Sequence, residues 1–327
     1  VWPAPPETPR IKYLGSLADS RDLKAAIGGL EAFRSILRGA RPPIRLCRPH
    51  AVAIGSGDML AVTDAEAGAV HIINLEERTH RLVTGWRTDR SGHQNGGRNE
   101  HKLDADGAEH LGVPMAVAWV GTRLFVTDAK RHEIIEFDAL GNFHGRFGAD
   151  VLLRPVGIAY VAERERLYVV DGGAHQVKVF DAAGRVERTI GRHGGGPGEF
   201  NYPSHIGCAG QSIVVADSGS FRVQWLDLEG NHIKTIGRKG DGAGDFSLPK
   251  GVAVDSEGHL YVVDAQFENV QVFDRQGRLL LAFGEEGRGP GQFWLPAGLA
   301  IDQDDRIWVA DSGNRRIQVF AYMRASL

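Results

Sequence analysis

Two histidines stand beside prolines that recur along this chain. His50 follows Pro49 directly, and His205 lies two residues after Pro203. A neutral imidazole can bind a transition metal or transfer a proton near neutral pH. The pair is therefore compatible with a metal-dependent lyase or hydrolase in which His50 and His205 bind the metal. The alternative is a site that binds a ligand through two histidines without a metal.

The residues beside the other recurring prolines show that the two histidines are exceptions within the repeat. The position after the proline holds His50, Met115, Val156, Ser204, Lys250 and Ala297. The next position holds Ala51, Ala116, Gly157, His205, Gly251 and Gly298. Because His205 replaces a small residue, we expect the fold either to use this side chain or to make room for it.

Further candidates lie between the predicted second and third strands of the repeats. They are His132, His175, Glu268 and Arg315. We expect these turns to reach the face that carries His50 and His205, so that four histidines converge around one mouth. The predicted ligand-binding residues are His50, Met115, His132, His175, Ser204, His205, Lys250 and Arg315.

A repeat with a period near 46 residues must position these side chains. Its most regular member is an aspartate that closes the second strand: Asp64, Asp128, Asp171, Asp217, Asp264 and Asp311. In the fifth repeat, residues 251–254, 260–263, 270–273 and 279–283 have strand character, with turn residues between them. Four short strands in about 40–50 residues are typical of propeller blades. The pattern predicts an all-β, six-bladed propeller of four-stranded antiparallel blades.

The repeated residues L-P-x-G-(V/I/L)-A-(V/I)-D, Y-V-V-D and S-G-N-R-R-I-Q-V-F resemble the NHL repeat over about residues 48–320. This resemblance implies a six-bladed propeller, which in that family often serves as an interaction platform. It implies no chemistry by itself. The primary expectation is therefore a non-enzymatic platform that binds a protein or a small ligand on the face around the central channel.

Around Pro49-His50 and Ala174-His-Gln-Val177 the chain also resembles the propeller of peptidyl-α-hydroxyglycine α-amidating lyase. In that family three blades place a zinc-binding histidine directly after this proline. Here only His50 matches, and His205 would be a displaced second ligand. Three protein ligands are usual for catalytic zinc. The expected cofactor is therefore none, with zinc as the alternative, or calcium at Asp104-Ala-Asp-Gly107, where most of a calcium loop is missing.

The ends of the chain suggest how the propeller closes. The last repeat stops after its third strand, and residues 10–15 have strand character. We predict that this N-terminal strand supplies the missing outer strand of the last blade and closes the ring. The expected organisation is a Pro-rich lead over 1–9 and one propeller over 10–327, with a short helix at about 20–38 and an insertion at about 84–111.

Two recurring features have a structural interpretation. Each repeated aspartate stands at a tight turn, where its carboxylate can accept hydrogen bonds from backbone N–H groups two residues on. The glycine-rich segments 194–200, 240–246 and 287–293 each end in a phenylalanine and lead to a strand instead of a helix. We expect these segments to be blade-to-blade crossings whose phenylalanine fills the gap between blades, and not phosphate loops.

The bulk composition limits the partners. The net charge is −3 and the pI is near 6.5, which disfavours nucleic acid as a partner. No apolar run is long enough for a transmembrane segment. The chain starts at Val1 with neither a Met nor a signal peptide, and the Pro-rich lead suits a tether from a lipid anchor. We therefore expect an exported, periplasmic or cell-surface protein.

Overall fold

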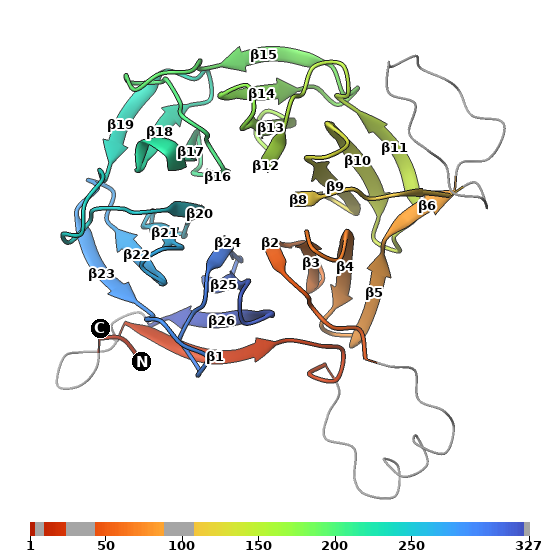
Figure 1. The fold of residues 1–327 in the computed structure, drawn as a ribbon, viewed down its shortest axis with the longest axis horizontal. Helices are drawn as coiled ribbons and strands as arrows, with labels where there is room; N and C mark the ends of the chain where they lie inside the picture. Colours follow the sequence, from red (N-terminus) through yellow and green to blue (C-terminus); the bar gives the residue numbers. More distant parts are fainter. Residues whose placement is uncertain (4–9, 24–42, 88–107, 324–327) are drawn as a thin grey trace, which may run out of the picture.

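Six four-stranded antiparallel sheets stand around a central axis, with the innermost strands β2, β8, β12, β16, β20 and β24 facing the centre (Figure 1). The computed structural model describes residues 1–3, 10–23, 43–87 and 108–323. The fold is a six-bladed β-propeller, as the repeat predicts. No helix in the described part of the chain is long and apolar enough to cross a membrane.

Each blade runs outward from the axis in chain order. Blade 1 consists of β2 (Pro49–Ile54), β3 (Met59–Asp64), β4 (Ala69–Asn74) and β5 (Thr79–Val83). Blade 2 consists of β8 (Pro114–Val120), β9 (Arg123–Asp128), β10 (Glu133–Asp138) and β11 (Phe143–Phe147). Blade 3 consists of β12 (Pro155–Val161), β13 (Arg166–Asp171), β14 (Gln176–Phe180) and β15 (Val186–Ile190).

The second half of the ring repeats the arrangement. Blade 4 consists of β16 (His205–Cys208), β17 (Ser212–Asp217), β18 (Arg222–Asp227) and β19 (His232–Ile236). Blade 5 consists of β20 (Pro249–Val254), β21 (Leu260–Asp264), β22 (Asn269–Phe273) and β23 (Leu279–Phe283). Blade 6 takes β24 (Pro296–Ile301), β25 (Arg306–Asp311) and β26 (Arg316–Tyr322) from the C-terminal end.

The fourth strand of blade 6 is β1 (Ile11–Leu17), which lies beside β26 (Figure 1). The two strands are antiparallel, with Ile11 opposite Tyr322 and Leu17 opposite Ile317. Ile11 is fully buried. The predicted closure by the N-terminal strand is confirmed, and the strand extends two residues beyond the predicted end. Joining the two ends of the chain removes the open edges that a six-sheet array would otherwise present.

The six repeated aspartates are all fully buried, and each fastens the segment that leads into its own blade. In blade 2, for example, Asp128 accepts hydrogen bonds from the backbone N–H groups of Gly112, Val113, Lys130 and Arg131. In blade 6, Asp311 accepts from the backbone of Trp294 and from the side chains of Asn314, Arg316 and Gln318. The predicted turn role is confirmed for Asp64, Asp128, Asp171 and Asp264, which accept from a backbone N–H two or three residues on. Asp217 and Asp311 instead accept from side chains beside the turn, and in all six blades the carboxylate also holds the incoming loop.

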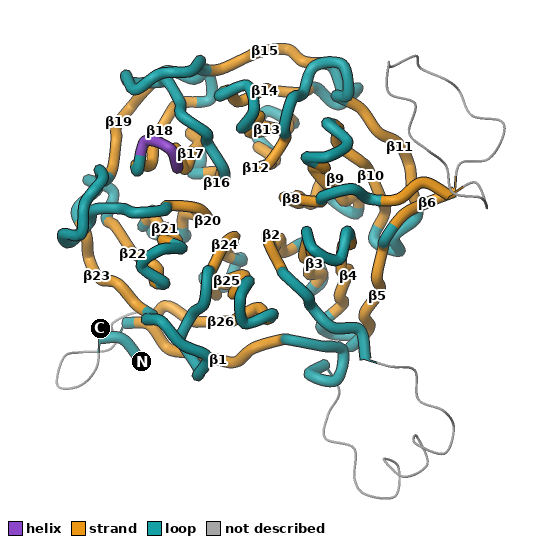
Figure 2. The backbone as a smooth tube through the Cα atoms, viewed as in Figure 1, coloured by secondary structure: helices purple, strands orange, loops and turns teal. Residues whose placement is uncertain are grey.

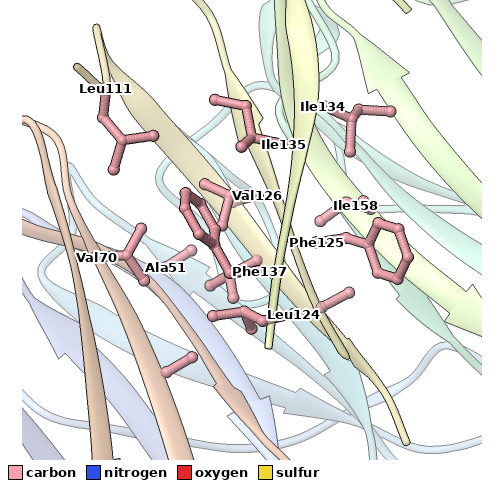
Figure 3. Packing of buried hydrophobic residues seen from close by; sticks show 14 of the residues in the cluster. Ala51, Val70, Leu111, Leu124, Phe125, Val126, Ile134, Ile135, Phe137 and Ile158 are labelled. Carbon is pink, nitrogen blue, oxygen red and sulfur yellow. The ribbon is translucent and has the colours of Figure 1, made fainter. Parts of the chain in front are cut away.

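The spaces between blades are filled by aromatic and branched side chains. Figure 3 shows part of this packing, where residues of blades 1, 2 and 3 meet around Phe125 and Phe137. Phe200, Phe246 and Phe293, which end the three glycine-rich segments, are fully buried. Their predicted role as plugs between blades is confirmed. These segments do not lead into helices.

Near the axis the inner strands of neighbouring blades approach one another closely. A Cβ atom on Gly298 would lie 2.6 Å from the carbonyl oxygen of His50, and one on Gly251 would lie 2.6 Å from that of Ala297. Only glycine fits at such distances without movement of the backbone. This explains why small residues dominate the inner strands.

Two additions to the repeat lie partly outside the described residues. The predicted helix at about 20–38 falls mainly on residues 24–42, which are not described, and residues 20–23 form a turn. In the described residues the one helical element is the 3-10 turn η1 (Ser218–Ser220) (Figure 2). The described ends of the insertion, β6 (Gly85–Arg87) and β7 (Ala108–His110), form a two-stranded sheet.

That sheet is fixed to blade 2 by buried charges. Arg131, 6% exposed, contacts the carboxylates of Glu109 and Glu133, and its guanidinium lies 4.9 Å from the ring centre of Trp86. Trp86 in turn stacks on Phe143. The calcium-like segment Asp104 to Gly107 lies outside the described residues.

Candidate functional site

The innermost strands are irregular where they reach the mouth of the channel. In five blades the pairing of the first two strands shifts directly after the proline, as between Pro49 and Ala51 in blade 1 and between Pro114 and Ala116 in blade 2. Such a bulge takes a residue out of the ladder and turns its side chain in a new direction. The residues released in this way include His50 and Met115, at the position where the repeats differ most.

A cavity of about 740 Å³ lies at this mouth. Its lining includes five of the predicted ligand-binding residues: His50, Met115, Ser204, His205 and Lys250. The other described lining residues are Arg48, Ala65, Glu66, Arg154, Val156, Gly172, Tyr202, Pro203, Leu295, Ala297 and Ser312. The topology therefore brings the residues after the prolines together from all six blades.

His50 and His205 come from blades on opposite sides of the ring, and their imidazoles stack at the mouth. The ring centres are 5.4 Å apart and the planes are inclined by 19°. His205 lines both the cavity and the narrow channel beyond it. Its side chain fits at the crowded axis because blade 4 enters its first strand directly at this residue, after Ser204.

The hydrogen bond of His50 fixes its tautomer. Its Nδ1 lies 2.8 Å from the carbonyl oxygen of Met115. Because a carbonyl oxygen only accepts, Nδ1 carries the proton and donates it. The Nε2 atom of neutral His50 is then left with a lone pair.

A chain of hydrogen bonds fixes the tautomer of His205 in the same way. The hydroxyl of Ser218 donates to the carbonyl of Pro249, so the hydroxyl of Ser204 must donate to Ser218 Oγ at 2.7 Å. Ser204 Oγ, at 3.0 Å, then accepts from Nδ1–H of His205. The Nε2 atom of His205 therefore carries a lone pair, and it is buried with no hydrogen-bond partner among the described residues. His205 as a whole is 7% exposed.

Cations outnumber carboxylates around the two histidines. Arg48, Arg154 and Lys250 line the cavity together with Glu66, and none of the three cations forms an ion pair within the described residues. Burial and the charge of Arg48 lower the pKa of Lys250. This concentration of positive charge stands in a chain whose net charge is −3.

The same surroundings keep both imidazoles neutral. Burial, together with the charge of Lys250, lowers the pKa of His50 to about 4. Burial, and then the neighbouring His50 and Lys250, hold the pKa of His205 well below its ordinary value. At neutral pH the mouth therefore combines two neutral hydrogen-bond acceptors with two arginines and one lysine.

Two exposed apolar side chains form part of the rim. Tyr202 is 59% exposed and Leu295 is 41% exposed, and each directly precedes the proline of its blade. Both adopt left-handed backbone conformations, with φ of 47° and 48°. Such a conformation is unfavourable for a bulky residue. The rim therefore presents apolar surface at the cost of some backbone strain.

Three predicted site residues lie elsewhere. His132, His175 and Arg315 do not line the cavity, because each occupies the left-handed position four residues after the buried aspartate of its blade. From there the side chain turns to the next loop: His132 Nδ1 donates to the carbonyl of Leu153, and His175 Nδ1 accepts from the backbone N–H of Tyr202 at 3.0 Å. The expected convergence of four histidines is reduced to two.

The cavity also includes residues that were not predicted from the sequence. Arg48, Arg154, Tyr202 and Leu295 lie directly before the prolines, whereas only the positions after the prolines were compared. Extending the comparison by one residue toward the N-terminus would have found them. Glu66, in the turn after β3, carries no comparable sequence signal.

The residues at the mouth offer only two imidazoles to a metal. In the described part of the chain, no group of three or more histidine, cysteine, aspartate or glutamate side chains is placed to bind a metal ion. Two neutral imidazoles among three cations are better suited to accepting hydrogen bonds from an anionic ligand than to holding a bare cation.

Comparison with known families agrees with the architecture. Residues 246–273 and 293–320 each match the NHL repeat, and residues 149–228 match a family described as a 6-bladed beta-propeller. No curated protein sequence matches the chain.

Solved structures with the same fold have diverse functions. An auxiliary nutrient binding protein from Bacteroides thetaiotaomicron has 13% identity and a TM-score of 0.62, over 85% of this chain and 70% of that one. Virginiamycin B lyase from Staphylococcus aureus has 12% identity and a TM-score of 0.56, over 85% and 96% of the two chains. A chain of the nidogen/laminin complex has 15% identity and a TM-score of 0.56, over 83% and 89%. At these identities the likeness shows the fold alone.

Proposed function

This chain is a six-bladed β-propeller that contains NHL repeats, and on that basis we propose that it is a non-enzymatic binding protein. Its ligand, a small molecule or a segment of a partner protein, occupies the mouth of the central channel. The observation that carries the proposal is the Nε2 atom of His205, a buried acceptor to which no described residue donates, beside a cavity of about 740 Å³. A buried polar atom without a partner costs about 1–3 kcal/mol, which a ligand that donates a hydrogen bond would recover.

The arrangement of the mouth supports binding more than catalysis. The nearby hydroxyl of Ser204 donates to Ser218 and accepts from Nδ1–H of His205, so His205 is not placed to take a proton from it. Structures of similar fold include a nutrient binding protein and a chain of a protein–protein complex, which makes either kind of partner reasonable.

A thermal-denaturation screen tests the proposal. Wild-type protein, His205→Phe and the control His144→Phe, whose imidazole is exposed on outer strand β11, are heated with a chemically diverse set of neutral, anionic and cationic small molecules. We expect at least one compound to raise the melting temperature of the wild type and of the control, but not of His205→Phe. The proposal fails if no compound stabilises the wild type, or if every stabilising compound acts equally on all three proteins.

A metal-dependent lyase or hydrolase remains the second candidate, because the stacked imidazoles both present Nε2 lone pairs. Metal analysis of untagged protein separates the two. Stoichiometric zinc that is lost in His50→Ala and in His205→Ala would favour the enzyme. Protein that is folded and free of transition metal would favour the binding function.

We also propose that the protein acts outside the cytoplasm, as an exported, periplasmic or cell-surface protein. Fractionation of the cells that produce it tests this directly. The protein should be found with the membrane or the exported fraction, and recovery with the cytosol would contradict the proposal.

A further inference from the structure

We propose that the mouth binds an acidic saccharide: a sugar ring with a carboxylate and neighbouring hydroxyl groups. This inference rests on the proposed function and adds the chemical class of the ligand. Three features of the mouth select that class, namely two fixed acceptors, unpaired cations and an exposed aromatic rim.

The first feature is the pair of imidazole acceptors. Donation from His50 to Met115 and from His205 to Ser204 leaves both Nε2 atoms as lone pairs. The rings stack with their centres 5.4 Å apart, so the two lone pairs belong to one site. A ligand that satisfies both must bring two donors. Vicinal hydroxyls on a sugar ring provide them, whereas a simple carboxylate provides none.

The second feature is the charge. Arg48, Arg154 and Lys250 line the cavity without ion pairs in the described part of the chain, and Glu66 is the one carboxylate among the described lining residues. A ligand with a negative charge removes the repulsion among these cations and gains charge-assisted hydrogen bonds. A neutral sugar would leave the cations unpaired.

The third feature is the rim. Tyr202 is 59% exposed at the mouth, with its ring beside that of His175, and Leu295 is exposed at another point of the rim. An aromatic ring with one apolar face and a polar tip packs well against a ligand that has both apolar and polar sides. The C–H face of a sugar ring is such a surface. The cavity volume of about 740 Å³ lies within the usual range for small-molecule sites and has room for more than one sugar unit.

Calorimetric titration with three matched probes tests the inference. Glucuronate carries both the charge and the hydroxyls, glucose carries the hydroxyls alone, and cyclohexanecarboxylate carries the charge on a six-membered ring without hydroxyls. We expect glucuronate to bind at least about tenfold more tightly than either of the others. If glucose binds as tightly as glucuronate, the cations do not contribute to recognition. If cyclohexanecarboxylate binds as tightly as glucuronate, the imidazole acceptors do not contribute. Either result overturns the inference.

Two variants connect the preferences to residues. In Lys250→Met the preference for glucuronate over glucose should fall at least about fivefold, whereas Lys12→Met, which removes an exposed lysine of β1, should keep it. In His205→Phe the preference for glucuronate over cyclohexanecarboxylate should fall by a similar factor. Unchanged preferences in both mouth variants would place the binding elsewhere and overturn the inference.

A fourth probe distinguishes the source of the ligand. If trigalacturonate binds more tightly than galacturonate, the ligand is a segment of an acidic polysaccharide. Equal affinity indicates a free sugar acid, and both results agree with the inference. If the thermal screen finds a neutral ligand that depends on His205 and no acidic sugar binds, the proposed function stands and the saccharide inference falls.

Discussion

The buried aspartates and the residues at the channel mouth occupy equivalent places in six blades, yet they behave in opposite ways. The aspartates are the same in every blade, fully buried and engaged with several donors. The residues after the prolines differ in every blade, and beside them the buried Nε2 atom of His205 has no hydrogen-bond partner among the described residues. Repetition in this chain marks what holds the ring together. Departure from repetition marks the surface at which we propose that a ligand binds.

The residues after the prolines can vary for a structural reason. In five blades the bulge after the proline removes one residue from the hydrogen-bonded ladder, so its side chain does not have to pack with the rest of the sheet. Substitution there changes the cavity and leaves the blade intact. Substitution of an aspartate instead releases both a turn and the loop that leads into the blade.

The largest expected effect is therefore on the aspartates. Asp311→Ala should lower the free energy of unfolding by about 4 kcal/mol, because it leaves Nε–H of Arg316 and the backbone N–H of Trp294 without their acceptor and removes the charge that Arg316 pairs with. Urea denaturation followed by tryptophan fluorescence measures the change. A loss of unfolding free energy below about 1 kcal/mol would contradict the claim that the aspartates hold the ring together.

The next effect concerns pH. The pKa of His50 is lowered to about 4 in the folded protein, against an ordinary value of 6.5, so the unfolded chain binds more protons between these values. The contribution of His50 to stability is thus complete above about pH 6.5 and is lost as the pH falls to 4. The loss is about 3 kcal/mol from this residue. His205 acts in the same direction.

The variant His50→Gln checks the assignment. The difference in unfolding free energy between pH 7 and pH 4 should shrink by about 3 kcal/mol relative to the wild type. His80, in blade 1, also has a pKa lowered to about 4 by burial and by His71, and His80→Gln serves as the comparison outside the mouth. An unchanged pH dependence in His50→Gln would show that this imidazole is charged or solvated.

A smaller effect compares two serines at equivalent positions. Ser218 donates to the carbonyl of Pro249 and Ser312 donates to that of Pro49, each linking one blade to the next. Ser218→Ala and Ser312→Ala should each cost about 1 kcal/mol in unfolding free energy. Only Ser218→Ala should alter the imidazole resonances of His205, since only Ser218 continues to Ser204 and His205. Identical NMR spectra of His205 in both variants would break the proposed chain.

The smallest effect on stability is expected at Lys250. Lys250→Met should change the unfolding free energy by no more than about 1 kcal/mol, and toward greater stability, because a half-buried cation that pairs with no described carboxylate is replaced by an apolar side chain of similar length. The pKa of His50 should rise in this variant, since the charge of Lys250 lowers it. NMR titration of the imidazole measures the shift, and a further fall of the pKa would contradict the account.

The ring was predictable from the sequence because its determinants are periodic. The recurring proline and aspartate gave the blade boundaries, and the missing outer strand of the last blade pointed to the N-terminal segment that became β1. Strand identity needed only the alternation of turns and apolar runs. The structure then added that each aspartate also binds the incoming loop, through contacts between residues 15 to 18 positions apart.

The site was only partly predictable, for a conformational reason. His132, His175 and Arg315 stand at a position with φ near 60°, where the side chain turns toward the next loop instead of the channel. Gly68 occupies this position in blade 1 and was the one local indication of a left-handed residue. The stacking of His50 on His205 depends on how far opposite blades approach across the axis, which no local pattern encodes.

The most direct test of the account is the state of the two imidazoles at the mouth, observed by long-range ¹H–¹⁵N NMR at pH 7. We predict that His50 and His205 are neutral, protonated on Nδ1 and bare on Nε2, and that saturation with an acidic saccharide shifts both Nε2 resonances while those of buried His71 in blade 1 stay in place. Charged imidazoles, protonation on Nε2, or Nε2 resonances that no ligand moves would contradict the claim that these atoms are the open acceptors of a binding site.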